Sequence, residues 1–214
     1  MNLKKQSGIG TYTGMQSVLL PHEVFHTTWT HAREIFHYLF VGDDTNLANF
    51  WENTARTDPE FVADHPVCAS NEPCHIVPLG MHGDDAGLFE HEKALVLSWN
   101  SVAVQRTTID NRILFGTMAC SKIITGLTLH QFYSVFVWSM NCLAEGKFPA
   151  RDHHNRKFGP DYYPERAAKA GNPLAGNYVG AWSEFRGDLI VSCKPFVSTT
   201  PPICSAIRPW GFRI

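Results

Sequence analysis

The stretch HIVPLGMHGDD, residues 75–85, opens the part of the chain that decides the fold. Its apolar run, His75–His82, stops at a glycine and two aspartates, which is typical of a β-strand and its end. Two more runs of strand length follow, KALVLSWNSVAVQ at Lys93–Gln105 and RILFGTM at Arg112–Met118. Because the connections are short, we predict a meander of antiparallel strands with Trp99 in or near the core.

A helix and a fourth strand follow this meander. Thr128 can cap a helix through Leu143, whose apolar residues recur at three- and four-residue spacing, and Gly146 stands where a C-terminal glycine belongs. Tyr178–Phe185 is the candidate fourth strand, after a proline-rich polar loop over residues 147–176. The order strand, strand, strand, helix, strand predicts a sheet with a helix packed on it.

The chain before the sheet has helical patterns. Pro21 suits a first helical position, and apolar residues recur at helical spacing from Val24 to Leu39. Thr45 or Asn46 can cap a second helix.

We therefore predict an α+β fold, in which an N-terminal helical segment precedes an antiparallel or mixed sheet with a packed helix. The expected organisation is a flexible lead-in over residues 1–16, a helical segment over 17–66, an α/β core over 67–190 and an irregular tail over 191–214. No internal repeat is visible.

Composition excludes several classes of protein. The chain has 214 residues, of which 44% are hydrophobic and 18% charged, and its net charge is −2, so no global field draws it to nucleic acid or anionic lipid. No apolar run has the length of a membrane span, and the N-terminus lacks the apolar core of a secretory signal. We expect an intracellular protein with six reduced cysteines, and the sequence does not distinguish nucleus from cytoplasm.

Aspartates follow two of the predicted strands. Asp84, with Asp85 beside it, closes the first strand, and Asp188 follows the fourth. If those strands are neighbours, their carboxylates meet at one edge of the sheet and can hold Mg²⁺, which prefers carboxylate oxygens. Two such ions can activate a water or a 3′-hydroxyl for attack on a phosphodiester. The alternative is that both aspartates are turn residues that bond to nearby backbone.

Six motifs carry a resemblance to a known family: LPHEVF at residues 20–25, FW at 50–51, HP at 65–66, PLGMHGD at 78–84, LSWNS at 97–101 and RGD at 186–188. They resemble a large multicopy family of dinoflagellate proteins, from about Gln16 to Asp188. That family resembles ribonuclease-H-like cut-and-paste transposases. The resemblance implies a ribonuclease-H-like fold, DNA as partner and Mg²⁺ as cofactor. It also implies Asp84 and Asp188 as catalytic metal ligands, with Asp85 as a stand-in for Asp84.

The sequence departs from that family after the last motif. Family members continue with a tryptophan, further aromatics and a Cys-Trp-x-Cys element, whereas here Leu189, Ile190 and Val191 follow. No Asp or Glu occurs after Asp188, so the third carboxylate expected of such a nuclease has no candidate there. We predict a truncated, inactive relative of a ribonuclease-H-like transposase. The alternative is an interaction domain without chemistry.

A second motif indicates zinc. His22-Glu23-Val24-Phe25-His26 matches the H-E-x-x-H pattern of zinc metallopeptidases, in which both histidines lie on one helix face and bind Zn²⁺ while the glutamate, here Glu23, acts as base. A third ligand, for which Glu52 on the next helix is a candidate, would complete the site.

The context of this motif favours a plain helix start. Pro21 places the pair in the first turn of the helix. In that interpretation His22 and Glu23 are exposed, and Val24 and Phe25 lie in the core. We predict that His22 and the second histidine form no metal site.

Two further clusters have a plain alternative. Cys68, Cys74, His75 and His82 are close in sequence, but their spacing fits no common zinc module and favours loops around a strand. The basic loop that contains Arg151, Arg156 and Lys157 is either solvated or a contact to a nucleic-acid backbone. No membrane partner is expected, and the oligomeric state is not encoded in any pattern we recognise.

Overall fold

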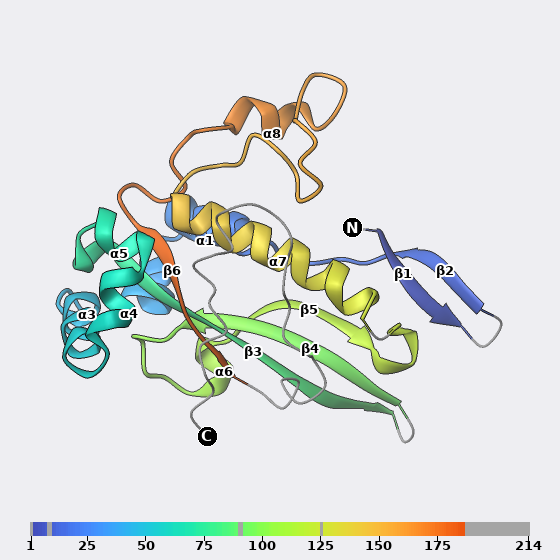
Figure 1. The fold of residues 1–214 in the computed structure, drawn as a ribbon, viewed down its shortest axis with the longest axis horizontal. Helices are drawn as coiled ribbons and strands as arrows, with labels where there is room; N and C mark the ends of the chain where they lie inside the picture. Colours follow the sequence, from blue (N-terminus) through green and yellow to red (C-terminus); the bar gives the residue numbers. More distant parts are fainter. Residues whose placement is uncertain (1, 8–9, 90–91, 125, 187–214) are drawn as a thin grey trace.

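The computed structural model describes residues 2–7, 10–89, 92–124 and 126–186. They form a mixed α+β protein, with one four-stranded sheet, a separate two-stranded hairpin and helices that pack on the larger sheet (Figure 1). No helix within these residues combines the length and apolar character needed to cross a bilayer.

The larger sheet consists of β3 (Ile76–Phe89), β4 (Glu92–Ser101), β5 (Ile113–Ala119) and β6 (Val179–Arg186), in the order β5-β4-β3-β6. β3, β4 and β5 pair antiparallel in succession, which confirms the predicted meander. β6 pairs with β3 in parallel. The first and fourth strands of the predicted order, which are β3 and β6, are therefore neighbours in the sheet.

β3 differs from the prediction at its end. The predicted strand end at Gly83-Asp84-Asp85 is wrong, because β3 continues to Phe89. Asp84 pairs with Val96 and Asp85 with Leu95 on β4. The long partner strand supplies a backbone hydrogen-bond ladder that outweighs the low strand propensity of glycine and aspartate.

One face of the sheet is covered by α7 (Thr128–Glu145) and α1 (Pro21–His31), as Figure 1 shows. α7 ends at Gly146, which has the left-handed φ of 66° expected of a C-terminal glycine. Phe115 of β5 packs against two phenylalanines of α7, and Trp99 of β4 is fully buried and stacks on Phe40 at 5.4 Å between ring centroids. The prediction that Trp99 lies in the core is confirmed.

The N-terminal helical segment is more broken than its apolar pattern predicts. α1 begins at Pro21, but Ala32, with φ −150° and ψ 63°, interrupts the helix. The chain then continues through five short elements, which are α2 (Arg33–Phe36), the π-helix η1 (His37–Val41), α3 (Asn46–Thr57), α4 (Pro59–Asp64) and α5 (Pro66–Ser70). A second, smaller core joins this segment to the sheet, where Trp51 Nε1 donates a hydrogen bond to the carbonyl of Ile76 at 2.8 Å.

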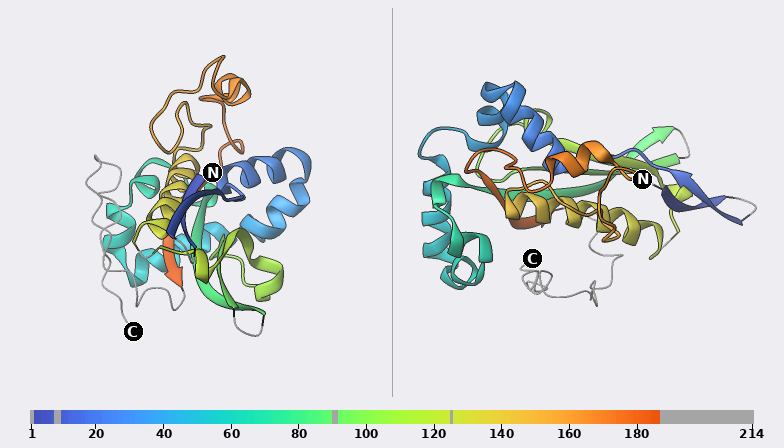
Figure 2. Two further views of the ribbon diagram at one scale, coloured as in Figure 1. Left: turned by 90° about the vertical axis from the view of Figure 1, so that its right-hand side faces the viewer. Right: turned by 90° about the horizontal axis from the view of Figure 1, so that it is seen from above.

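Residues 1–16, expected as a flexible lead-in, contain β1 (Asn2–Ser7) and β2 (Gly10–Met15), which pair antiparallel. The segment 147–176, expected as a polar loop, carries α8 (Pro164–Lys169) and lies above α7, away from the sheet (Figures 1 and 2). Three short elements complete the description: η2 (Pro73–His75), α6 (Thr108–Asn111) and η3 (Cys120–Lys122). The predicted tail over 191–214 lies outside the described residues.

Candidate functional site

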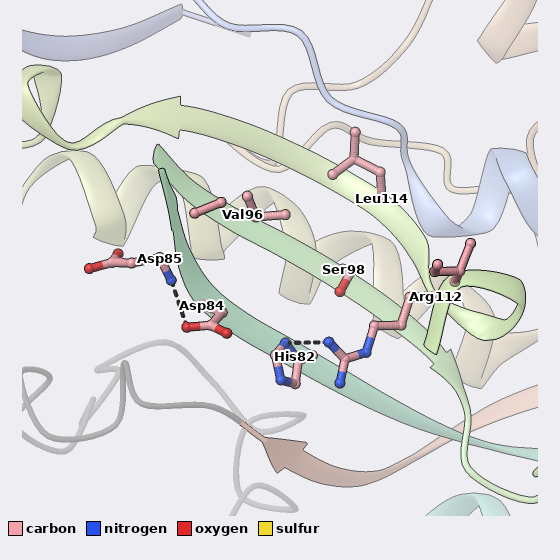
Figure 3. Close-up of a pocket in the computed structure, with 9 residues that line it drawn as sticks. His82, Asp84, Asp85, Val96, Ser98, Arg112 and Leu114 are labelled. Atoms are coloured by element: carbon pink, nitrogen blue, oxygen red, sulfur yellow. Dashed lines mark hydrogen bonds between the residues drawn. The ribbon is translucent and has the colours of Figure 1, made fainter. Parts of the chain in front are cut away.

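The face of the sheet opposite α7 carries an open depression of about 360 Å³, shown in Figure 3. We call it the open-face depression. Side chains alternate between the two faces of a strand, so neighbours of the core residues on β3, β4 and β5 point into it. Its lining residues are His82, Asp84, Asp85, Ala86, Val96, Ser98, Ile109, Arg112 and Leu114.

Asp84 is one of two exposed aspartates that line this depression. Its Oδ1 accepts a hydrogen bond from the backbone N–H of Asp85 at 2.8 Å. Two residues earlier on the same face, His82 Nδ1 accepts a hydrogen bond from Arg112 at 3.2 Å, as the dashed line in Figure 3 shows. An imidazole whose Nδ1 accepts a hydrogen bond carries its proton on Nε2. The site thus combines a carboxylate, a ring N–H and a guanidinium.

The side chain of Asp85, the other aspartate, has partners of its own. Its side chain leaves the strand in another direction (Figure 3), and its Oδ2 lies 3.8 Å from Nζ of Lys93. Its Oδ1 accepts a weak hydrogen bond from the thiol of Cys120 at 3.7 Å. Burial and the neighbouring Asp85 carboxylate raise the pKa of Cys120. Asp85 therefore belongs to a small cluster with a lysine and a thiol.

Asp188, the other predicted metal ligand, lies outside the described residues. The structure describes β6, the strand that precedes it in the chain. β6 pairs with β3 up to Arg186, which stands opposite His82. Arg186 Nε lies 2.7 Å from Oε1 of Glu184 on the same strand.

His22 is buried, and the prediction that it is exposed at a helix start is wrong. It is 1% exposed because α1 packs against α7, where Ser139 Oγ lies 2.7 Å from His22 Nδ1 and accepts the His22 backbone N–H at 3.1 Å. Its Nε2 is buried and has no hydrogen-bond partner among the residues that the structure describes, and Oε1 of Glu23 lies 3.8 Å from it. Burial lowers the pKa of His22 to about 3, so the ring is neutral at pH 7.

The other residues of the zinc motif are engaged elsewhere. His26 Nδ1 bonds to the carbonyl of Leu174 at 2.8 Å, and Glu23 pairs with Arg166 at 3.4 Å. Glu52, the candidate third ligand, pairs with Arg56 on the surface of α3. Among the residues that the structure describes, no third histidine, cysteine or carboxylate converges with His22 and His26.

The basic loop is organised by an aspartate that the sequence analysis did not single out. Asp152 is buried and accepts hydrogen bonds from the backbone N–H groups of His154 and Arg156, from the Arg156 guanidinium and from the Tyr162 hydroxyl. Burial alone would raise the pKa of Asp152, but these donors outweigh it and lower the pKa to about 2. The positive charge of Arg156 is therefore paired with the Asp152 carboxylate. Arg151 and Lys157 are exposed on a short antiparallel bridge.

The structure also brings together three metal-binding side chains. Glu72, Cys74 and His75 meet at the turn η2, with their donor atoms within 4.8 Å of one another. Cys68 and His82, which the sequence analysis grouped with them, are not part of this cluster. Glu72 is absent from the predicted cluster because cysteine and histidine spacing does not identify a carboxylate ligand. The signal that could have identified it is a proline between a carboxylate and a Cys-His pair.

Comparison with known proteins gives no relative. No protein-family model, no curated protein and no solved structure matches this chain.

Proposed function

We propose that the chain is a ribonuclease-H-like domain related to cut-and-paste transposases, and that it retains part of a phosphodiester-cleaving site without turnover. The observation that carries this proposal is the strand order β5-β4-β3-β6, in which an antiparallel meander is extended by a parallel strand after a helix. The sequence order strand, strand, strand, helix, strand implies this arrangement only if its first and fourth strands are neighbours, and they are.

The register of the parallel pair supports a two-aspartate site. The last described pair joins His82 to Arg186. Asp84 follows two residues after His82, and Asp188 follows two residues after Arg186 in the chain. A parallel register that continued over those two residues would set the two carboxylates on neighbouring strands and on one face. Two such carboxylates can share a Mg²⁺ ion.

A two-metal reaction needs more than these two ligands. No Asp or Glu follows Asp188 in the sequence, and Asp85 is turned toward Lys93 and Cys120. The proposed site therefore binds a single divalent cation weakly and does not position a second ion for in-line attack. We accordingly propose that this domain binds DNA but does not cleave it.

The proposed DNA contact is the basic loop above α7. Arg151 and Lys157 are exposed there, while Arg156 is paired with Asp152 and lies over the Tyr162 ring at 4.6 Å. Contacts to phosphates release counterions, so binding should weaken as salt rises. Because the net charge of the chain is −2, such binding would be local and weak.

The test is Mn²⁺ binding to the full chain, followed by paramagnetic resonance, together with a cleavage assay on linear and supercoiled DNA. We expect a weak site that Asp84→Asn weakens by at least about tenfold, whereas the matched surface variant Asp161→Asn leaves it unchanged. We expect no cleavage in Mg²⁺ or Mn²⁺.

Two results would overturn parts of this proposal. Metal-dependent cleavage that Asp84→Asn abolishes would show an active nuclease. Mn²⁺ binding that is indifferent to both Asp84→Asn and Asp188→Asn would remove the metal site, and an interaction domain without chemistry would then be the better account.

A further inference from the structure

Three metal-binding side chains of different chemistry meet just before β3. His75 Nδ1 lies 3.4 Å from Glu72 Oε2 and 3.7 Å from Cys74 Sγ, and Cys74 Sγ lies 3.9 Å from Glu72 Oε2. The three donor atoms form a nearly equilateral triangle. This cluster is at the start of β3, whereas Asp84 lies past the middle of that strand.

The local sequence explains why these side chains converge. Pro73 opens the 3-10 turn η2, with its φ already restricted by the ring. The His75 backbone N–H donates to the Glu72 carbonyl at 2.9 Å, and residues three apart eclipse in a 3-10 turn. Glu72 and His75 therefore stand on one side, with Cys74 beside them.

Packing fixes the orientation of the His75 imidazole. His75 is half-buried, and its ring meets Tyr178 edge to face, with centroids 5.4 Å apart and planes at 83°. Tyr178 itself packs against Trp29 and Phe36 in the aromatic part of the core. A ligand whose orientation is set by packing loses less freedom when it binds a metal ion.

The triangle can be compared with the edges of a zinc tetrahedron. With metal–ligand distances of about 2.3 Å to sulfur and about 2.0 Å to nitrogen and oxygen, tetrahedral angles require about 3.3 Å between N and O and about 3.5 Å between S and either. The corresponding distances here, 3.4, 3.7 and 3.9 Å, exceed these by a few tenths of an ångström. Small side-chain rotations would complete the geometry.

We propose that Glu72, Cys74 and His75 form a site for one zinc ion, bound through a carboxylate oxygen, a thiolate and an imidazole nitrogen. Thiolate and imidazole select a borderline-soft ion such as Zn²⁺ over Mg²⁺. Three protein ligands leave a fourth position for water or an external ligand. Because Cys74 binds as the thiolate, its proton is released on binding and affinity rises with pH.

Cys68 provides a matched control close by in the chain. It is half-buried outside the triangle, and burial raises its pKa to about 11, so it remains a thiol. Cys74 is exposed, and so is Glu72. Substituting the exposed ligands should therefore leave the fold intact, which circular dichroism would verify.

The experiment is a titration of the untagged, reduced full chain with Co²⁺, which replaces Zn²⁺ and reports thiolate ligation by charge-transfer absorption. We expect one Co²⁺ per chain, with a thiolate band that Zn²⁺ displaces and excess Mg²⁺ does not. Cys74→Ser should abolish the band, and His75→Ala should weaken binding by at least about 100-fold, since even indirect supports of metal sites contribute 10- to 100-fold. Cys68→Ser should retain both the thiolate band and the affinity for Co²⁺.

Absence of a thiolate band in the wild-type chain would overturn this proposal, as would a band that survives Cys74→Ser. Loss of the band in Cys68→Ser would also overturn it, because the thiolate would then lie elsewhere. The readout is independent of the proposed Mg²⁺ site, since Asp84 has no part in it.

Discussion

The two faces of the four-stranded sheet use the same strands for different purposes. Phe115 and Leu114 are consecutive residues of β5, yet the first is fully buried against α7 and the second is 41% exposed in the open-face depression. The same alternation separates Met81 from His82 along β3, where the first is buried and the second is half-buried. Successive side chains of a strand point to opposite faces, so one strand can stabilise the fold with one face and present polar groups on the other.

The largest effect should come from truncating the covered face. Phe115→Ala removes a ring that packs against Phe132 and Phe136, and should lower the free energy of unfolding by about 3–5 kcal/mol. Leu114→Ala, one residue away on the open face, should lower it by less than about 1 kcal/mol. Urea denaturation measures both. Equal losses would contradict the division of the sheet into a core face and an open face.

A second prediction concerns pH and the covered layer. His22, between α1 and α7, has its pKa lowered by burial from 6.5 to about 3. Below pH 6.5 the unfolded chain binds a proton at His22 that the folded chain excludes, so stability is complete above that pH and falls below it. Between pH 6.5 and 4 the loss should be about 3 kcal/mol, from about 1.4 kcal/mol for each pH unit.

His22→Gln should remove that part of the pH dependence, because glutamine does not titrate. Thermal or urea unfolding at several pH values would measure the difference between the two proteins. An identical dependence of the free energy of unfolding on pH in the wild type and the variant would show that folded His22 binds a proton as readily as unfolded His22.

The smallest effect tests how closely the covered layer packs. A Cβ added at Gly180 of β6 would lie 2.6 Å from Leu79 Cδ1 and 2.9 Å from Leu143 Cβ, so Gly180→Ala should destabilise by about 1–3 kcal/mol. At Gly87 of β3, no atom of the described part of the chain lies within 4 Å of such a Cβ, and Gly87→Ala should change stability by less than about 1 kcal/mol. A tolerated alanine at Gly180 would indicate looser contact between α7 and β6.

The elements of the fold follow from local pattern to a large extent. Apolar runs of strand length predict the four strands of the larger sheet, Pro21 marks the start of α1, and Gly146 marks the end of α7. The end of β3 is predicted wrongly because strand pairing outweighs local preference there, whereas β1 and β2 are missed because their sequences lack an apolar run of strand length. Gly83, Asp84 and Asp85 have low strand propensity, yet β4 pairs with all three.

The candidate sites, too, contain some features that the local sequence predicts and others that only packing decides. The residue types at Asp84 and in the basic loop are visible in the sequence, because carboxylates and guanidinium groups carry their chemistry wherever they are placed. Burial of His22 is not visible there, since it depends on Ser139 of a helix more than a hundred positions later. Local pattern therefore specifies strands, helices and the chemical groups available. The partners, the faces and the burial of those groups are set by packing between segments far apart in the chain, because each long-range contact depends on the placement of both segments.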